Sequence, residues 1–352
     1  PLSGKIQAGT FHSFCLKAIA TLPKSFDATG LNVIDGDDQK ALMTVARNNL
    51  VHSMDGSRAR KTPKAAELLK FHSYSRNTCQ TPEAYLPEFT DMEPEQATLC
   101  CRIFDEYRRL KTERGYLDYD DLLWCFSEAL DRKPDLRRDL TGLFDEVLVD
   151  EMQDTNPLQF RILRHFASER VRLFCVGDPA QSIYRFRGAE FQYIHRFGEL
   201  FPESTVLRLT ENYRSNQEIL DLGNWLLAGS PFDYGEGLHA ARGACGLLPV
   251  LHDFDGVAEE AEWVADAIEE RRSADIPYSD MMVLVRTSFD AKPFEAEFIR
   301  RSIPYRYIGG TKITESAHVR DVMSLLRVVR NRRDDLAWMR YLQLWPRVGK
   351  VR

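Results

Sequence analysis

The sequence predicts an α/β fold in which the strands of a parallel sheet alternate with helices. Three short apolar stretches, at residues 144–149, 171–176 and 205–209, each run directly into a polar loop, and each is predicted to be a buried strand. A helical pattern at about residues 158–167 lies between the first two. Strands and helices that alternate in this way indicate a parallel sheet with helices on both faces. In such sheets ligands bind beyond the carboxyl ends of the strands, where these polar loops lie.

A second α/β pattern begins near Leu247. Residues 248–254 and 281–285 are predicted to be strands, and apolar residues recur on one helical face at residues 257–268 and 319–329. A chain of 352 residues has the length of two or three domains. The two patterns therefore predict two α/β domains in sequence.

The segment from about residue 31 to residue 115 differs from both patterns. It has long helical patterns, few strand signals and a polar break at about residues 53–63. We expect it to be a helical insertion in the first α/β domain. A glycine-rich stretch at residues 229–246 is expected to be a linker or a long loop.

Composition narrows the class of protein. The net charge of −6 argues against a general nucleic-acid coat, but it leaves room for a local basic groove. No apolar run approaches the roughly 18–20 residues that span a bilayer, and there is no signal peptide, so we expect a cytoplasmic protein with no membrane partner. Seven scattered cysteines without a C-x-x-C pair favour reduced, mostly buried thiols over a zinc or iron–sulfur site.

Residues 147–151 read Val-Leu-Val-Asp-Glu, which is the form of a Walker B strand. Nucleotide hydrolysis needs a carboxylate to hold Mg²⁺ and a second group to orient the attacking water. Asp150 and Glu151 at a strand end can do both, because successive side chains diverge. Alone this pattern is weak, since solvated charges at the end of a strand explain it about equally well.

Further segments along the chain carry a wider resemblance. They are residues 9–15, 117–123, 150–156, 177–189, 212–215, 303–305, 309–310, 320–322 and 325–327. In order and in spacing, along essentially the whole chain, they resemble the motifs of the UvrD/Rep/PcrA-type superfamily 1 DNA helicases. The probability that so many ordered motifs agree by chance is very small.

The resemblance implies an ATP-dependent DNA helicase that acts in repair, replication or recombination and is built from RecA-like domains. The first RecA-like domain would comprise residues 1–30 and 115–208, with residues 31–114 as its helical insertion. Residues 209–352 would form an incomplete second RecA-like domain. ATP and Mg²⁺ are the implied cofactors, and single-stranded DNA and duplex junctions are the implied partners.

The resemblance also implies roles for the residues that bind and hydrolyse ATP. Asp150 would ligate Mg²⁺, and Glu151 would orient the hydrolytic water. Gln181 would sense the γ-phosphate and couple it to DNA, and Arg214 would stabilise charge on the transferred group. Tyr213 would stack on the adenine; without the neighbouring Arg214, an ordinary half-buried tyrosine at a strand end explains it as well.

Tyr184, Phe186 and Arg187 are the implied contacts to DNA. Aromatic side chains stack on bases of any sequence, and a cation attracts phosphate. Family members commonly have Trp at this position, and the ring of Phe186 offers less area for stacking than Trp does. From spacing alone, Tyr184 and Phe186 would be core residues. Thr10 and His12 are expected near the DNA as well, although a lone histidine is otherwise structural.

Several parts of the family's motor are not found in the sequence. The family has a phosphate loop that ends in Gly-Lys-Thr, whereas the Ser-Gly-Lys of residues 3–5 is followed by Ile-Gln and lies too close to residues 9–15. The C-terminal motifs are not found either, and residues 346–350 resemble the family's junction into its second inserted domain. We expect the chain to be a piece of a longer helicase, as Pro1 at its start also indicates. Alone, the piece is expected to bind ATP and Mg²⁺ weakly and to have no helicase or ATPase activity.

Two other classes of protein compete with this interpretation. A degenerate paralogue that binds DNA or protein without hydrolysis is the alternative. A small-molecule P-loop kinase is disfavoured, because it does not explain residues 181–188.

Overall fold

A computed structural model describes residues 6–28, 32–52, 61–169, 171–309, 317–345 and 348. The chain divides into two compact units. The first unit contains Pro1–Thr210, Leu227–Gly237 and Arg333–Leu336, and the second contains Glu211–Leu226, Leu238–Arg332 and Ala337–Arg352. This division keeps the segment predicted as a helical insertion within the first unit, and the predicted domain boundaries stay a prediction.

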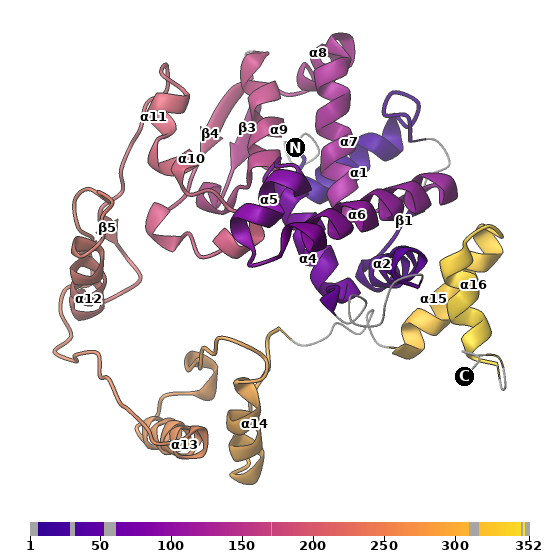
Figure 1. The fold of residues 1–352 in the computed structure, drawn as a ribbon. Helices are drawn as coiled ribbons and strands as arrows, with labels where there is room; N and C mark the ends of the chain where they lie inside the picture. Colours follow the sequence, from indigo (N-terminus) through magenta and orange to yellow (C-terminus); the bar gives the residue numbers. More distant parts are fainter. Residues whose placement is uncertain are drawn as a thin grey trace. The chain divides into compact units, whose positions relative to one another are not determined.

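The first unit is mainly helical and contains two pairs of short parallel strands (Figure 1). Its elements in chain order are α1 (Phe11–Thr21), β1 (Asn32–Val33), α2 (Gly36–Val51), α4 (Ala65–Asn77), α5 (Pro82–Phe89), α6 (Pro94–Arg114), β2 (Tyr116–Leu117), α7 (Tyr119–Arg132), α8 (Pro134–Thr141), β3 (Glu146–Val149), the 3-10 turn η1 (Met152–Asp154), α9 (Pro157–Ser168), β4 (Arg172–Cys175), the 3-10 turns η2 (Pro179–Gln181) and η3 (Arg185–Arg187), α10 (Gln192–His195) and α11 (Phe197–Leu200).

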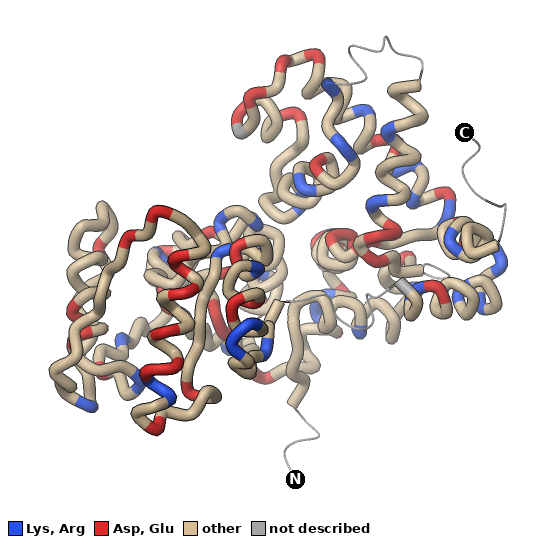
Figure 2. Tube along the Cα trace, turned by 90° about the horizontal axis from the view of Figure 1, so that it is seen from below, with Lys and Arg blue, Asp and Glu red and all other residues tan. Residues whose placement is uncertain are grey.

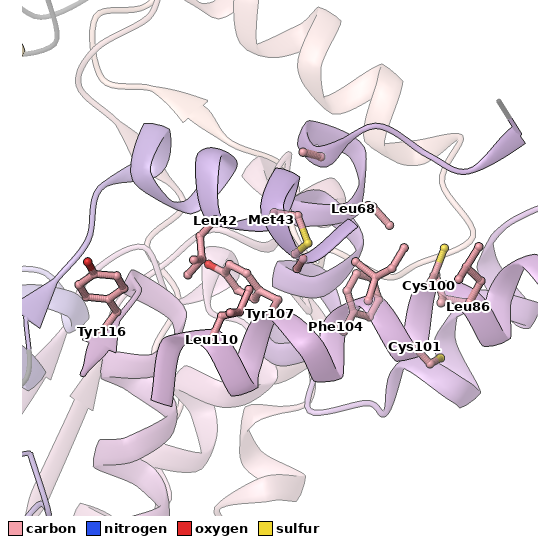
Figure 3. Close-up of a cluster of buried hydrophobic side chains, with 14 of the residues drawn as sticks. Leu42, Met43, Leu68, Leu86, Cys100, Cys101, Phe104, Tyr107, Leu110 and Tyr116 are labelled. Atoms are coloured by element: carbon pink, nitrogen blue, oxygen red, sulfur yellow. The ribbon is translucent and has the colours of Figure 1, made fainter. Parts of the chain in front are cut away.

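Helices α2, α4, α5 and α6, which we call the helical insertion, pack around one apolar core. Figure 3 shows side chains of α2 and α6 meeting there, among them Leu42, Met43, Phe104 and Tyr107, which are all fully buried. Helix α6 begins with a proline in its first turn and ends at Arg114, and it is capped by Gly115, whose φ of 65° is left-handed. Proline has no backbone N–H, and an N–H in the first turn of a helix has no partner within the helix. Glycine readily adopts the left-handed conformation that follows a helix end, so the sequence determines both ends of this helix.

A distant stretch of the chain completes this core. Leu336 is buried within it, and the Tyr116 hydroxyl donates to Asp334 Oδ1 at 3.0 Å. Arg114 Nε lies 3.5 Å from Asp335 Oδ2. Residues 333–336 are therefore fixed within the first unit by apolar packing, a hydrogen bond and an ion pair.

The strands β3 and β4 carry the sequence motifs. They pair in parallel, with Val149 opposite Cys175. Helix α9 connects them and begins with a capping box, in which Asn156 and Gln159 exchange side-chain and backbone hydrogen bonds. The structure thus confirms the predicted strands at 144–149 and 171–176 and the helix between them.

Three other predicted strands are wrong for the described structure. Residues 205–209, 248–254 and 281–285 have no regular secondary structure and form no ladder with a neighbouring strand, and apolar residues such as Leu251 and Leu284 are exposed. An apolar run becomes a strand only where a partner satisfies its backbone groups and another layer covers it. The sequence pattern indicates the tendency but not the partner.

The second unit contains helices and a further short parallel pair, in which β5 pairs with β6. Its elements are β5 (Glu211–Asn212), α12 (Gln217–Ala228, whose end belongs to the first unit), β6 (His239–Ala240), α13 (Val257–Ser273), the 3-10 turn η4 (Tyr278–Asp280), α14 (Ala291–Arg300), α15 (Ala317–Arg330) and α16 (Asp335–Gln343, whose first two residues belong to the first unit). Helices α13 and α14 share a small core. The helices predicted at 257–268 and 319–329 are confirmed, although the predicted apolar face of α15 is largely exposed.

All seven cysteines are free thiols; three are buried, whereas Cys79 and Cys245 are exposed. In the part of the chain that the structure describes, no helix has both the length and the apolar character needed to cross a membrane. Residues 3–5, Gly310 and the junction at 346–350, apart from Val348, lie outside the described residues.

Candidate functional site

The ends of β3 and β4 bring two motif loops together. Because Val149 pairs with Cys175, Asp150 and Gly177 begin neighbouring loops at the carboxyl edge of the strand pair. Two backbone bonds continue the contact past the strands: Val176 N–H donates to Val149 O at 2.8 Å, and Met152 N–H donates to Val176 O at 2.9 Å. The loops are therefore joined by their backbones before any side chain is considered.

Gln153 joins the same loops through its side chain. Its Nε2 donates to Glu151 Oε2 at 2.7 Å, and its Oε1 accepts from the Asp178 N–H at 3.0 Å. Its backbone oxygen accepts from the Ser182 hydroxyl at 3.2 Å. Gln153 is fully buried. A buried amide with both ends bonded holds its partners in one arrangement.

Asp178 extends this network to the third motif. Its two carboxylate oxygens accept from the Ala180 N–H at 2.9 Å and from Gln181 Nε2 at 2.8 Å. Polar contacts thus run from Glu151 through Gln153 and Asp178 to Gln181. We call this chain of contacts the loop network.

The backbone of these loops is unusual at two positions. Glu151 has a φ of 52° and a ψ of 45°, a left-handed conformation that costs a residue with a side chain about 1–2 kcal/mol. Opposite it, a Cβ on Gly177 would lie 2.5 Å from Gln153 Oε1 and 2.9 Å from Met152 N, so only glycine fits. Strained conformations of this kind are concentrated at functional sites.

Three carboxylates lie in the first loop. Asp150 and Glu151 are exposed, and Asp150 Oδ1 accepts from the Glu151 N–H at 3.0 Å. Burial and the nearby Glu151 raise the pKa of Asp154. No group of three or more His, Cys, Asp or Glu side chains among the described residues is arranged to hold a metal by itself. Mg²⁺ usually takes one or two carboxylates and completes its shell with substrate phosphates, and the exposed carboxylate of Asp150 fits that need. The role of Asp150 as the ligand of Mg²⁺ stays a prediction.

The predicted DNA-binding aromatic residues form an exposed cluster. Phe186 is 71% exposed and Tyr184 is half-buried, so the core placement that spacing favoured is wrong for Phe186. Their ring centroids lie 6.0 Å apart. The guanidinium carbon of Arg187 lies 5.0 Å from the centroid of Tyr184 and 5.4 Å from that of Phe186. A cation beside two accessible rings suits a stacked, negatively charged ligand.

Thr10 and His12 belong to the start of α1. The Thr10 hydroxyl caps the helix by accepting from the Ser13 N–H at 3.2 Å. His12 lies edge-on to Tyr119, with ring centroids 6.4 Å apart, and burial lowers its pKa. These contacts are structural, and a role for either residue in binding DNA stays a prediction.

Tyr213 and Arg214 belong to the second unit. Asn212 Oδ1 accepts from the N–H groups of Arg214 at 2.9 Å and of Ser215 at 2.8 Å, which fixes the turn. The Tyr213 hydroxyl donates to Glu211 Oε2 at 2.5 Å, and this bond raises the pKa of Tyr213. Tyr213 is 69% exposed, so it is not the half-buried tyrosine of the alternative. Its ring is open to a ligand, and the approach of Arg214 to the first unit stays a prediction.

Sequence reasoning assigned no role to Gln153, Asp178 or Asn212. Each lies inside a motif, Gln153 and Asp178 in the turns after β3 and β4 and Asn212 at the end of β5, where a polar side chain can bond to the loop backbone. Figure 2 shows that basic and acidic residues are interspersed along the chain, so charge alone does not mark the site.

The sequence was compared with known proteins. It matches the UvrD/REP helicase N-terminal domain over residues 2–202 and the UvrD-like helicase C-terminal domain over residues 207–349. It is 29% identical to the ATP-dependent DNA helicase PcrA of Staphylococcus epidermidis over 348 residues, and 29% identical to that of Staphylococcus aureus over 351 residues. Each alignment covers 98% of this chain and 46% of the relative, so the chain spans about half the length of these relatives. These matches confirm the resemblance of the motifs, and the chain belongs to the UvrD/Rep helicase family.

Proposed function

We propose that this chain is part of an ATP-dependent DNA helicase that couples ATP hydrolysis to movement along single-stranded DNA and to unwinding at duplex junctions. The loop network carries the proposal, because it connects Glu151 to Gln181 through two side chains. A motor needs its water-orienting group and its nucleotide-sensing group to respond to the same event. The two PcrA relatives are named ATP-dependent DNA helicases, which supports the same function.

The first unit supplies the groups around the transferred phosphate. Asp150 would hold Mg²⁺ together with the phosphates of ATP, and the ion would neutralise part of their charge. Glu151, fixed by Gln153, would orient the attacking water. Gln181, fixed by Asp178, would respond to the γ-phosphate. These roles require positioning and charge, not a covalent step by the protein.

The second unit would supply Tyr213 and Arg214. The exposed ring of Tyr213 would stack on adenine, and the guanidinium of Arg214 would stabilise charge on the transferred phosphate. Asn212 holds their turn in place. We propose that residues 209–352 form an incomplete second RecA-like domain, that residues 1–30 and 115–208 form the first, and that residues 31–114 are its insertion; the parallel strand pairs and intervening helices support this division.

Tyr184, Phe186 and Arg187 would bind the DNA. The two rings offer surfaces for bases of any sequence, and Arg187 would attract the backbone phosphates. Thr10 and His12 would contact the same strand.

We expect the 352 residues alone to hydrolyse ATP very slowly. The sequence contains no glycine-rich loop ending in Gly-Lys-Thr to hold the phosphates. The C-terminal motif from which the family takes a second arginine for the γ-phosphate is not found in it either, and loss of one such arginine costs roughly 10³–10⁵ in rate. DNA-stimulated ATP hydrolysis should therefore be measured for this chain and for the longest natural protein that contains it.

In the longest protein, Glu151→Gln should lower the turnover number about a hundredfold or more. Robust turnover by the 352 residues, abolished by Glu151→Gln, would show that no further segment is needed. A longest protein without turnover would favour a paralogue that only binds DNA or a protein.

A further inference from the structure

The end of α4 contacts the loop that follows the acidic motif. Asn156 Nδ2 donates to Asn77 Oδ1 at 3.0 Å, and Asn77 is the last residue of α4. Asn156 is also the cap of α9, since its Oδ1 accepts from the Gln159 N–H at 2.9 Å. Only the short turn η1 and Thr155 separate Asn156 from Glu151. The helical insertion therefore contacts the loop that follows Glu151 through the side-chain amide of Asn77.

The other end of the Asn77 amide is bonded as well. Its Nδ2 donates to Asp120 Oδ1 at 3.0 Å and to Ser73 O at 2.9 Å. An ionised carboxylate only accepts hydrogen bonds, so the amide nitrogen must face Asp120 and the oxygen must face Asn156. We call the contacts of Asp120, Asn77 and Asn156 the Asn77 bridge.

Ion pairs fix the Asp120 end of the bridge. Lys111 Nζ lies 2.5 Å from Asp118 Oδ2 and 2.6 Å from Asp121 Oδ2, and all three side chains are buried. Arg76, which precedes Asn77 on α4, lies 3.1 Å from Asp121 Oδ1. The start of α7 and the end of α4 are thus held together, so the Asn77 bridge has a rigid base.

A second contact joins the end of α4 to the aromatic cluster. A Cβ on Gly188, which follows η3 and Arg187, would lie 3.1 Å from Thr78 Cγ2. The Glu190 N–H donates to Thr155 O at 3.1 Å. The same end of α4 therefore lies against both the loop after Glu151 and the turn that carries Arg187.

We propose that Asn77 is a positioning residue, through which the helical insertion sets the position of the Glu151 loop and thereby the rate of DNA-stimulated ATP hydrolysis. Asn77 contacts no nucleotide in this role. It acts through Asn156, whose place at the start of α9 determines where the loop between β3 and α9 closes. The inference rests on the proposed function and names a residue for its regulation.

The experiment exchanges the donor and the acceptor of the bridge in the longest natural protein that contains the chain. Asn77→Asp places a carboxylate against Asp120, and we expect the turnover number with single-stranded DNA to fall about tenfold with little change in KM for ATP. Asp120→Asn keeps an acceptor oxygen for Asn77 and is the matched control, with turnover near that of the wild type. Combining both changes restores one donor and one acceptor, and turnover should return to within about threefold of the control.

Each outcome decides the inference. Wild-type turnover in Asn77→Asp would overturn it, and so would a double variant no faster than Asn77→Asp. If Asn77→Asp alone does not fold, the double variant is compared with Asp120→Asn: equal turnover supports the bridge and lost turnover overturns it.

A second measurement separates this inference from the proposed function. Hydrogen exchange of residues 154–161 is followed in the 352-residue chain, where no ATP hydrolysis is required. Faster exchange in Asn77→Asp, reversed by Asp120→Asn, supports the contact even if the longest protein proves inactive, in which case only the proposed function fails. Unchanged exchange in Asn77→Asp overturns the bridge whatever the activity.

Discussion

Two regions of the first unit bury their apolar side chains to very different extents. In the helical insertion Phe104 is 1% exposed, whereas on the strand pair Leu148 is 71% exposed and Phe174 is 56% exposed. A helix satisfies its backbone internally and needs only neighbouring helices to cover its apolar face. A strand of a parallel sheet needs partners at its edges and layers on both faces. Helices close a core within a short segment, but strands depend on distant ones.

The same regions differ in their polar groups. In the helical insertion and the start of α7, the buried Lys111 has carboxylate partners on two sides. At the strand ends, Glu151 is exposed and held in a left-handed conformation. Satisfied groups stabilise the fold, and strained, exposed groups are available to a ligand.

The largest difference in stability is expected when one phenylalanine in each region of the 352-residue chain is replaced by alanine. Phe104→Ala should lower the free energy of unfolding by about 3–5 kcal/mol, because it leaves a cavity in a closed core. Phe174→Ala should lower it by less than about 1 kcal/mol, because its ring already lies in water. Urea unfolding measures both free energies, and equal losses for the two variants would show that the two regions do not differ in how burial stabilises them.

A smaller effect is expected from the buried cation. Lys111→Met leaves the buried Asp118 without a cation and leaves Asp121 with Arg76 alone, and we expect a loss of about 3 kcal/mol in the free energy of unfolding. Arg109→Met is the control, since it removes pairs with Glu106 and Glu113 at the surface, where water screens the charges and the loss of stability is small. A loss for Lys111→Met as small as that of the control would show that the ion pairs do not hold the two helices.

The smallest effect concerns Asp120, whose pKa is raised to about 6 by burial and by the nearby Asp118. Between about pH 4 and pH 6 the folded chain keeps a proton that the unfolded chain has lost, so this carboxyl lowers stability as the pH rises through that range. Asp120→Asn should therefore stabilise the chain by about 1–2 kcal/mol at pH 7, and the gain should shrink towards pH 4. Unfolding at several pH values measures this, and a gain that does not depend on pH would contradict the assignment.

The sequence was most informative where structure depends on near neighbours. The helices at 257–268 and 319–329 follow from local patterns, and the structure contains both. The strands predicted at 205–209 and 248–254 could not be judged in the same way, because a strand needs a partner that the local pattern does not identify.

The candidate site was predicted in the same uneven way. The order of the motifs indicated that the loops with Asp150 and Gln181 follow neighbouring strands, as they do. The link through Gln153 could not be predicted, because it depends on the left-handed turn at Glu151. The exposure of Phe186 was missed because η3 is a short 3-10 turn, in which the spacing of aromatic residues carries no information about burial.

The hydrogen bond from Tyr116 to Asp334 spans 218 residues, and the buried Leu336 lies just beyond it. During synthesis at roughly 5–20 residues per second, the ribosome needs about 10–40 seconds to pass from one partner to the other. For that interval the helical insertion has its helices but lacks part of its core. Until residues 333–336 have been made, the nascent chain therefore exposes apolar surface that a chaperone could bind.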